Sequence, residues 1–170
     1  MLASREKFEA REKKTIRKGE NVMVQFTETN GPLSVEIIEQ FELKHSISLP
    51  EQYRSFLLEF NGGRPIPKLF KISDEQGPDI LRMFFGIGEM YNNLAENIHI
   101  YEDRLPIGLM PIGNDPGGNV ICIGTDEEYY GKIYFWDHEE ESEDLDDISN
   151  VYLLADSFDD FLSEMYTTPE

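Results

Sequence analysis

The segment from Leu49 to Gly63, LPEQYRSFLLEFNGG, constrains the fold more than any other part of the chain, because it encodes a helix together with both its ends. Pro50 has no N–H and a preset φ, so it suits the first helical turn, and the helix is predicted to begin at about Pro50. The apolar side chains at i, i+3, i+4 and i+7 share one face that must meet a core: Tyr53, Phe56, Leu57 and Phe60. After Asn61, two glycines permit positive φ, so the chain can turn left-handed and end the helix.

Length and composition predict one soluble, cytoplasmic domain. At 170 residues the chain is long enough for one hydrophobic core and too short for two comfortable ones. Its first residues are charged and lack the apolar stretch of a secretory signal peptide, and no apolar run approaches the roughly 20 residues that span a bilayer. The single cysteine, Cys122, lies in the apolar run VICIG, which predicts a buried, reduced thiol.

The net charge of −19 is unevenly distributed along the chain. Residues 1–20 carry seven Lys or Arg against four Glu, a net charge of +3, so the rest of the chain carries −22. Such a field repels phosphate backbones and anionic lipid, which argues against a nucleic-acid or membrane partner outside the basic N-terminal arm. It attracts a basic protein, although acidity also serves simply to keep a protein in solution, and charge alone leaves both interpretations open.

The sequence divides into a charged N-terminal extension, residues 1–22, and a single domain, residues 23–170. The extension lacks a sustained apolar stripe and suggests a frayed helix or an extended arm. The domain is predicted to open with a short strand at 23–27 and a helix from the N-cap Ser34 to about Leu43. A hydrophobic staple and a continuing apolar face are expected to bury four side chains of this helix: Leu33, Ile37, Ile38 and Phe41.

The remaining segments alternate between strand and helix patterns. Two strands at 68–72 and 82–88 are expected to pair as a hairpin, and the spacing of Tyr91, Leu94, Ala95 and Ile98 predicts a third helix. A meander of short β-rich runs begins at Leu109, then comes a strand at 151–155, then a helix capped by Ser157 with Asp160. Strands in the middle with helices around them indicate an α+β fold.

A search for reaction chemistry finds no catalytic motif. The sequence has no G-x-S-x-G, no G-K-[ST] after a glycine loop, no H-E-x-x-H and no C-x-x-C, which predicts no catalytic residues, no cofactor and no metal. His138, between Asp137 and Glu139, fits a partly exposed surface histidine. The run GNDPGGN at 113–119 fits a hairpin turn better than a calcium loop, because it lacks the ligand spacing of an EF-hand.

The segment 137–147, DHEEESEDLDD, is too densely charged to be buried. One interpretation is a solvated loop that leads from the tryptophan-containing strand to Val151. The other is a patch that steers or binds a cationic partner.

Three segments in this order resemble the SUKH superfamily, named partly for fungal cell-wall synthesis regulators of the Smi/Knr type: LPEQYRSFLLEFNGG at 49–63, GNDPGGNVICIGTDEEYYGKIYFWDHE at 113–139 and VYLLADSFDDFL at 151–162. The opening helix of that family is similar to SVEIIEQFELKHSISLP at 34–50, so the resemblance spans about Leu33 to Tyr166. Residues 1–22 lie outside it, and the stretch from Arg64 to Arg104 matches no recognisable pattern.

The resemblance implies a single α+β domain with a curved, mostly antiparallel sheet and flanking helices, used as a protein-binding scaffold and not as an enzyme. Bacterial domains of this kind resemble immunity proteins that neutralise a cognate polymorphic toxin, commonly a nuclease, whereas fungal relatives resemble regulatory interaction modules. It also implies structural roles for the signature residues Leu49, Pro50, Tyr53, Phe56, Asn61, Gly62, Gly63, Gly118, Asn119 and Trp136.

Three hypotheses about function follow. In the first, the protein is an immunity protein that covers the active site of a basic toxin with an acidic surface, and its contact residues are Asp115, Asp126, Glu127, Glu128, Asp137, Glu139, Glu140 and Glu141. In the second, it is a regulatory interaction module of the Smi/Knr type. In the third, it is a hydrolase that uses Asp115, Asp126 or His138.

Overall fold

A computed structural model describes residues 15–18 and 22–167 of the chain. The helices of this part are α2 (Val35–His45), α3 (Glu51–Glu59), α4 (Leu94–Tyr101), α5 (Phe158–Glu164) and the short 3-10 helix η1 (His138–Glu140). The strands are β1 (Thr15–Lys18), β2 (Val22–Thr27), β3 (Arg64–Ile66), β4 (Leu69–Ser73), β5 (Gly77–Ile80), β6 (Met83–Phe84), β7 (Leu109–Asn114), β8 (Val120–Gly124), β9 (Ile133–Trp136) and β10 (Val151–Ala155).

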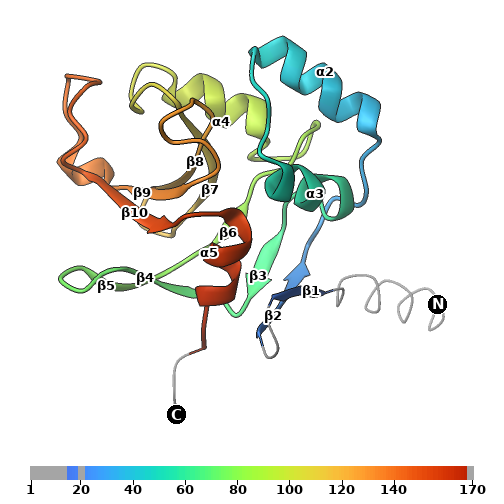
Figure 1. The fold of residues 1–170 in the computed structure, drawn as a ribbon, viewed down its shortest axis with the longest axis horizontal. Coiled ribbons are helices and arrows are strands. Elements are labelled where there is room, and N and C mark those ends of the chain that lie inside the picture. The colour runs from blue at the N-terminus through green and yellow to red at the C-terminus, as the bar shows by residue number, and fades with distance from the viewer. Residues whose placement is uncertain (1–14, 19–21, 168–170) are drawn as a thin grey trace.

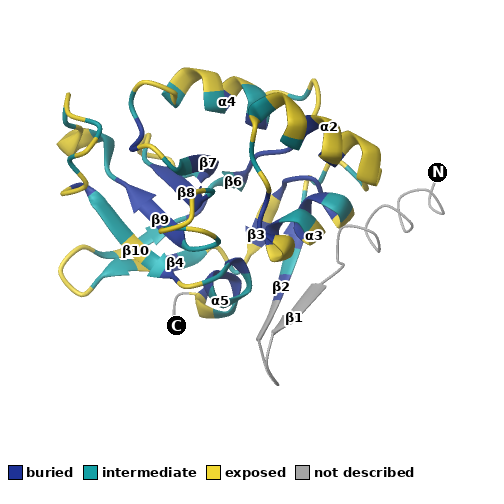
Figure 2. Cartoon of the chain, turned by 45° about the horizontal axis from the view of Figure 1, so that its top comes forward, coloured by how far each residue is buried: buried dark blue, intermediate teal, exposed yellow. Residues whose placement is uncertain are grey.

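The strands form antiparallel sheets, which confirms the predicted α+β class (Figure 1). The largest sheet has the order β10-β9-β8-β7-β6, so the predicted meander forms its centre. A three-stranded sheet, β1-β2-β3, and the β4-β5 hairpin complete the described strands. Helix α5 lies between β10 of the large sheet and β2 and packs beside α3, whereas α2 and α4 lie along another side of the domain (Figures 1 and 2).

The main core is a cluster of aromatic side chains from elements that are distant in sequence. The ring of Phe56 on α3 lies 4.9 Å from Phe26 on β2, 5.3 Å from Phe84 on β6 and 5.2 Å from Phe158 on α5, measured between centroids. All four side chains are at most 1% exposed. Burying each contributes about 1.5–3 kcal/mol, so this cluster joins the two larger sheets and two helices into one folding unit.

The central strands are buried on both faces. Alternate residues of β8 and β9 point to opposite sides, so Ile121 and Phe135 join the main core, whereas Cys122 and Trp136 join a second, smaller core with Leu105. Cys122 is a free, fully buried thiol, as predicted, and burial raises its pKa.

The end of α3 shows why its signature residues are structural. Asn61 is 2% exposed with a φ of 51°, and its side chain both accepts from the amide of Ile87 at 2.7 Å and donates to the carbonyl of Ile87 at 2.9 Å. A Cβ at Gly62 would stand 2.9 Å from the carbonyl oxygen of Phe84, and one at Gly63 would stand 2.8 Å from that of Thr27. Gly62 and Gly63 are therefore needed for two reasons. They adopt positive φ, and they let the backbone at Phe84 and Thr27 approach the end of α3 closely.

The hairpin expected between 68–72 and 82–88 is wrong. Strand β4 pairs with β5, which lies in the segment 73–81 between the two expected strands, whereas β6 pairs with β7 in the large sheet. Phe84 and Phe85 are both buried, and their amides donate to the carbonyls of Gly63 and Ile112, so tertiary packing draws this strand away from its neighbour in sequence.

Two predicted helical faces are also corrected. Ile38 and Phe41 of α2 are buried, but Ile37 is 41% exposed. Helix α4 begins only at Leu94, because the side chain of Asn93 caps it by accepting from the amide of Glu96 at 2.9 Å, and Tyr91 is left 81% exposed outside the helix.

The predicted extension contains one described element. Strand β1 pairs with β2 in a register that runs from Thr15 opposite Gln25 to Lys18 opposite Val22. Residues 1–14 and 19–21, the rest of the predicted extension, lie outside the described residues.

Candidate functional site

The predicted contact residues fall at opposite ends of the same pair of strands. Strands β8 and β9 pair antiparallel, with Val120 opposite Trp136 and Ile123 opposite Ile133. The loop 125–132 therefore lies at one end, and the turn 115–119 and the loop 137–150 lie at the other, separated by about 15 Å of strand. The first end carries Asp126, Glu127 and Glu128; the second carries Asp115, Asp137, Glu139, Glu140 and Glu141.

Asp115 faces inward. It is 5% exposed, and its Oδ1 accepts hydrogen bonds from the amides of Gly117 at 3.0 Å and Asn119 at 2.7 Å, while its Oδ2 accepts from the Asn119 side-chain amide at 2.8 Å. This closed network confirms that 113–119 is a hairpin turn. Since its carboxylate is used inside the turn, Asp115 is left out of the surface proposed below.

His138 fastens this turn to η1. Its backbone amide donates to Oδ1 of Asn119 at 3.0 Å, and its Nε2 donates to the carbonyl of Gly117 at 2.8 Å. Gly118, at φ 95°, leaves room for the imidazole, because a Cβ there would stand 3.2 Å from Nε2. The half-buried His138 thus holds loops together, and Asp126 of the hydrolase hypothesis lies at the far end of β8, so the structure does not gather its three residues into one site.

Asp79 of β5 is coupled to Asp115. Burial, and then the neighbouring carboxyl of Asp115, raise the pKa of Asp79 to about 7. The Oδ2 of Asp79 is buried and has no hydrogen-bond partner among the described residues. Asp79, on the β4-β5 hairpin, therefore lies close to the turn that Asp115 closes.

The acidic loop after β9 is anchored at Glu141. The guanidinium of Arg104 donates to both carboxylate oxygens of Glu141, at 3.1 and 2.9 Å, and lies 4.9 Å from the ring centroid of Tyr101 and 5.4 Å from that of Trp136. This bidentate pair raises the pKa of Arg104. Glu139 and Glu140 remain exposed on the anchored loop.

At the other end of β8, Asp126, Glu127 and Glu128 are exposed, and Asp126 lies beside a pocket. Asp126 packs directly against Gly108, where a Cβ would stand 2.9 Å from the Cβ of Asp126. Gly108 and Thr125 both line the pocket, and the carbonyl of Gly108 accepts from the amide and the hydroxyl of Thr125 at 2.8 and 3.4 Å.

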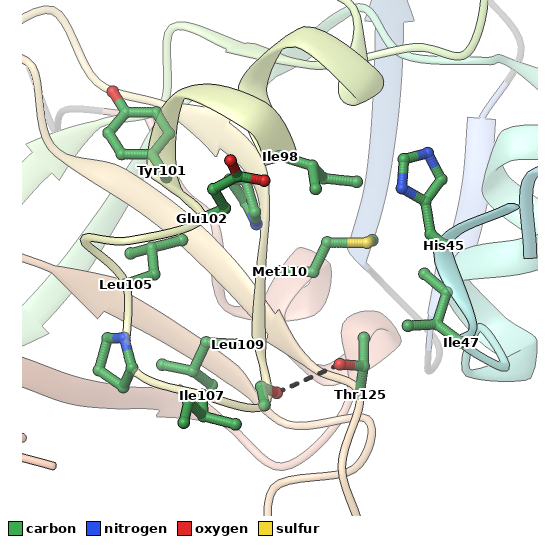
Figure 3. Close-up of a pocket in the computed structure, with 13 residues that line it drawn as sticks. His45, Ile47, Ile98, Tyr101, Glu102, Leu105, Ile107, Leu109, Met110 and Thr125 are labelled. Atoms are coloured by element: carbon green, nitrogen blue, oxygen red, sulfur yellow. Dashed lines mark hydrogen bonds between the residues drawn. The ribbon is translucent and has the colours of Figure 1, made fainter. Parts of the chain in front are cut away.

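The pocket has a volume of about 270 Å³ and mostly apolar walls. His45 and Ile47, at the end of α2, lie on one side of it, and Tyr101, Glu102 and Leu105 lie on the other (Figure 3). The rest of its lining comes from Ile98 on α4 and from the segment 106–111 with Thr125.

Glu102 and Asp103 are acidic residues that the sequence prediction missed. Both are exposed directly after α4, and Glu102 lines the pocket while Arg104 next along the chain binds Glu141. The segment 102–108 therefore runs from one acidic end of β8 to the other. The sequence did contain a signal for these two residues. Acidic side chains at a helix C-terminus interact unfavourably with the helix dipole, so their presence indicates a role other than helix stability.

We call the acidic residues along this path the acidic surface. It comprises the half-buried Asp137 and eight exposed residues: Glu102, Asp103, Asp126, Glu127, Glu128, Glu139, Glu140 and Glu141. Within the described ranges 15–18 and 22–167, no group of three His, Cys, Asp or Glu side chains is arranged to hold a metal ion. The helices of the same part of the chain are all too short or too polar to cross a membrane.

The fold and the acidic surface define the class of protein. It is an antiparallel α+β domain whose central strands are buried on both faces and whose loops carry the acidic surface. The chain belongs to the SMI1 / KNR4 family (SUKH-1), which its residues 32–164 match. It is also similar to the SPbeta prophage-derived uncharacterized protein YokK of Bacillus subtilis (strain 168), with 29% identity over 151 residues that cover 79% of this chain and 75% of that protein. The family match confirms the resemblance drawn from the three sequence segments.

Proposed function

We propose that this protein is an immunity protein that binds a cognate polymorphic toxin, a basic nuclease, and neutralises it by covering the active site. The observation that carries the proposal is the acidic surface, which gathers charges from α4, the β8-β9 loop and the loop after β9 in a member of the SUKH-1 family. Most of these side chains are exposed, where a carboxylate contributes little to folding, so a role in binding accounts for them better. The exceptions are Glu141, which pairs with Arg104, and Asp137, whose Oδ1 accepts from the amide of Glu139.

Electrostatics gives the mechanism. A nuclease is basic where it binds phosphate, so an acidic protein that covers this groove excludes the substrate. Long-range attraction between the two surfaces supports association at up to about 10⁸–10⁹ M⁻¹s⁻¹ at low salt. Occlusion requires no reaction, in keeping with a sequence that contains no G-x-S-x-G, H-E-x-x-H or C-x-x-C motif.

The test is a neutralisation assay with the toxin domain encoded by the adjacent reading frame. We expect the purified protein to inhibit cleavage of DNA or RNA by that domain at a one-to-one ratio, and to form a complex whose association slows as salt rises. Full nuclease activity in the presence of excess protein, with no complex on size-exclusion chromatography, would contradict the proposal.

The second candidate is a regulatory interaction module, favoured by the name of the family itself, SMI1 / KNR4. The genomic neighbour separates the two candidates. An adjacent frame that encodes a large secreted protein with a variable toxic C-terminus supports immunity, whereas capture of a cellular regulator and the absence of such a frame support regulation.

A further inference from the structure

The pocket beside Gly108 combines an apolar lining with acidic groups. Its walls present the side chains of Ile47, Ile98, Leu109 and Met110, and Glu102 extends its carboxylate at one side (Figure 3). Asp126 lies against Gly108 at its edge, and Ile107, 72% exposed, extends the apolar wall toward solvent. An occupant must therefore offer both an apolar stem and a positive charge.

His45 adds an unused polar atom to the pocket. Its ring packs against that of Phe41 at a tilt of 46°, with centroids 4.4 Å apart, and its Nε2 is buried without a hydrogen-bond partner among the described residues. Burial, and then the neighbouring Lys44, lower the pKa of His45, so the ring is neutral at neutral pH and does not repel a cation. The carboxylate of Glu102 lies 3.4 Å from the imidazole of the exposed His99.

We propose that this pocket receives one lysine or arginine side chain of the basic partner, with its aliphatic stem against Ile98, Leu109 and Met110 and its charged end at Glu102. The inference rests on the proposed function in that it takes the partner to be a basic protein. Long cationic side chains bury their methylene groups on apolar surface while the charged end stays near carboxylates and water, which is the chemistry this pocket offers.

The chain already binds one cation in this manner nearby. Arg104 lies over Tyr101 and Trp136 and pairs with Glu141, so an apolar surface with a carboxylate at its edge already holds a guanidinium. Tyr101 also lines the pocket, on the side that Glu102 shares. A purely apolar occupant would desolvate Glu102 and leave it unpaired, and an anion would meet Glu102 and Asp126, so charge complementarity selects a cation.

The test uses small probes that need no toxin. The protein, labelled with ¹³C at the methyl groups of Ile, Leu and Met, is titrated with n-butylguanidinium and separately with n-butylurea, a neutral molecule of the same size. We expect n-butylguanidinium to shift the methyl signals of Ile98, Leu109 and Met110 with a dissociation constant of roughly 1–20 mM, as its small size allows. We expect n-butylurea to bind at least about fivefold more weakly, because it lacks the charge that Glu102 attracts.

Two variants with the same charge change complete the test. Glu102→Gln is expected to abolish the preference for n-butylguanidinium, whereas Glu39→Gln, exposed on α2 outside the pocket, is expected to keep it. Equal binding of the two probes, shifts confined to other methyl groups, or no shift overturns the inference. Neutralisation of the toxin is measured separately, so a failed titration with intact neutralisation removes the pocket and leaves the proposed function standing.

Discussion

The turn around Asp115 and the loop from Asp126 to Glu128 lie at opposite ends of β8 and are both acidic, yet they use their charge differently. Asp115 is 5% exposed and accepts three hydrogen bonds within its own turn. Asp126, Glu127 and Glu128 are exposed, and Asp126 lies against Gly108 at the edge of a pocket. The same kind of side chain thus shapes a hairpin at one end and is free to attract a partner at the other.

The difference shows that charge density in the sequence does not identify a binding surface. A carboxylate that accepts hydrogen bonds from backbone N–H groups stabilises the fold, because charge-assisted hydrogen bonds of this kind hold the turn in one conformation. An exposed carboxylate adds little to stability but contributes to the long-range field. Substitutions at the two ends of β8 separate these contributions.

The largest effect is expected for Asp115→Ala. It leaves the amides of Gly117 and Asn119 without their acceptor, and we expect a loss of about 3 kcal/mol in the free energy of unfolding, measured by urea denaturation. The matched control Asp126→Ala is expected to change stability by less than about 0.5 kcal/mol. An equal loss of free energy of unfolding in the two variants would contradict the proposed difference between the two ends of β8.

Arg104→Ala tests how firmly the acidic loop after β9 is held. The variant loses a bidentate pair with Glu141 and the contact of a cation with two aromatic rings, which together are expected to contribute about 1.5 kcal/mol, allowing for partial solvent exposure. Hydrogen exchange of the amides in 137–147 is expected to accelerate, while the amides of 125–132 keep their rates. Unchanged exchange in 137–147 would show that the loop is held by other contacts.

Replacing the three acids of the β8-β9 loop together, as Asp126→Asn, Glu127→Gln and Glu128→Gln, tests the open end. We expect unchanged stability and an association with the basic toxin about tenfold slower at low salt, with a flatter salt dependence, measured by stopped-flow fluorescence. The control carries the same charge change elsewhere, as Glu36→Gln, Glu39→Gln and Glu75→Gln. Equal slowing by both sets would indicate that only net charge matters.

The smallest effect is expected for the protonation of Asp79, which lies next to the turn around Asp115. Asp79 has a pKa of about 7 in the folded chain against 3.8 as a model carboxyl, so the folded state holds the proton more tightly, and stability falls as pH rises from about 4 through 7. Asp79→Asn is expected to be about 1 kcal/mol more stable than the wild type at pH 8, a value well below the full shift because the carboxyl is only half buried. At pH 4 that gain is expected to vanish, and a gain of equal size at both pH values in thermal unfolding would refute the coupling.

Short sequence signals correctly predicted the two ends of α3 and the N-cap of α5. Pro50 precedes α3, Asn61-Gly62-Gly63 ends it, and the side chain of Ser157 accepts from the amide of Asp160 at 3.1 Å to cap α5. The predicted hairpin between 68–72 and 82–88 is wrong because strand pairing depends on tertiary packing. Phe84 gains more by entering the aromatic core, 5.3 Å from Phe56, than by pairing with the strand before it in sequence.

The acidic residues of the site were predicted from charge, but their grouping was not. The sequence placed Asp115 with the contact residues, and the structure turns it inward; the sequence passed over Glu102 and Asp103, and the structure places them between the two acidic ends of β8. The sequence of an acidic segment predicts neither which of its side chains are buried nor which other residues they contact, since both depend on which strands pair.

The sequence by itself determined the class of fold, the family, both ends of α3, the N-cap of α5 and the excess of negative charge, because these depend on dihedral preferences, apolar spacing and composition. The tertiary structure decided which acids are buried, which border the pocket beside Gly108 and which strands share a sheet. These outcomes depend on contacts between segments far apart in the chain, such as Gly108 with Asp126 and Arg104 with Glu141, and such contacts are selected by the packing of the whole core.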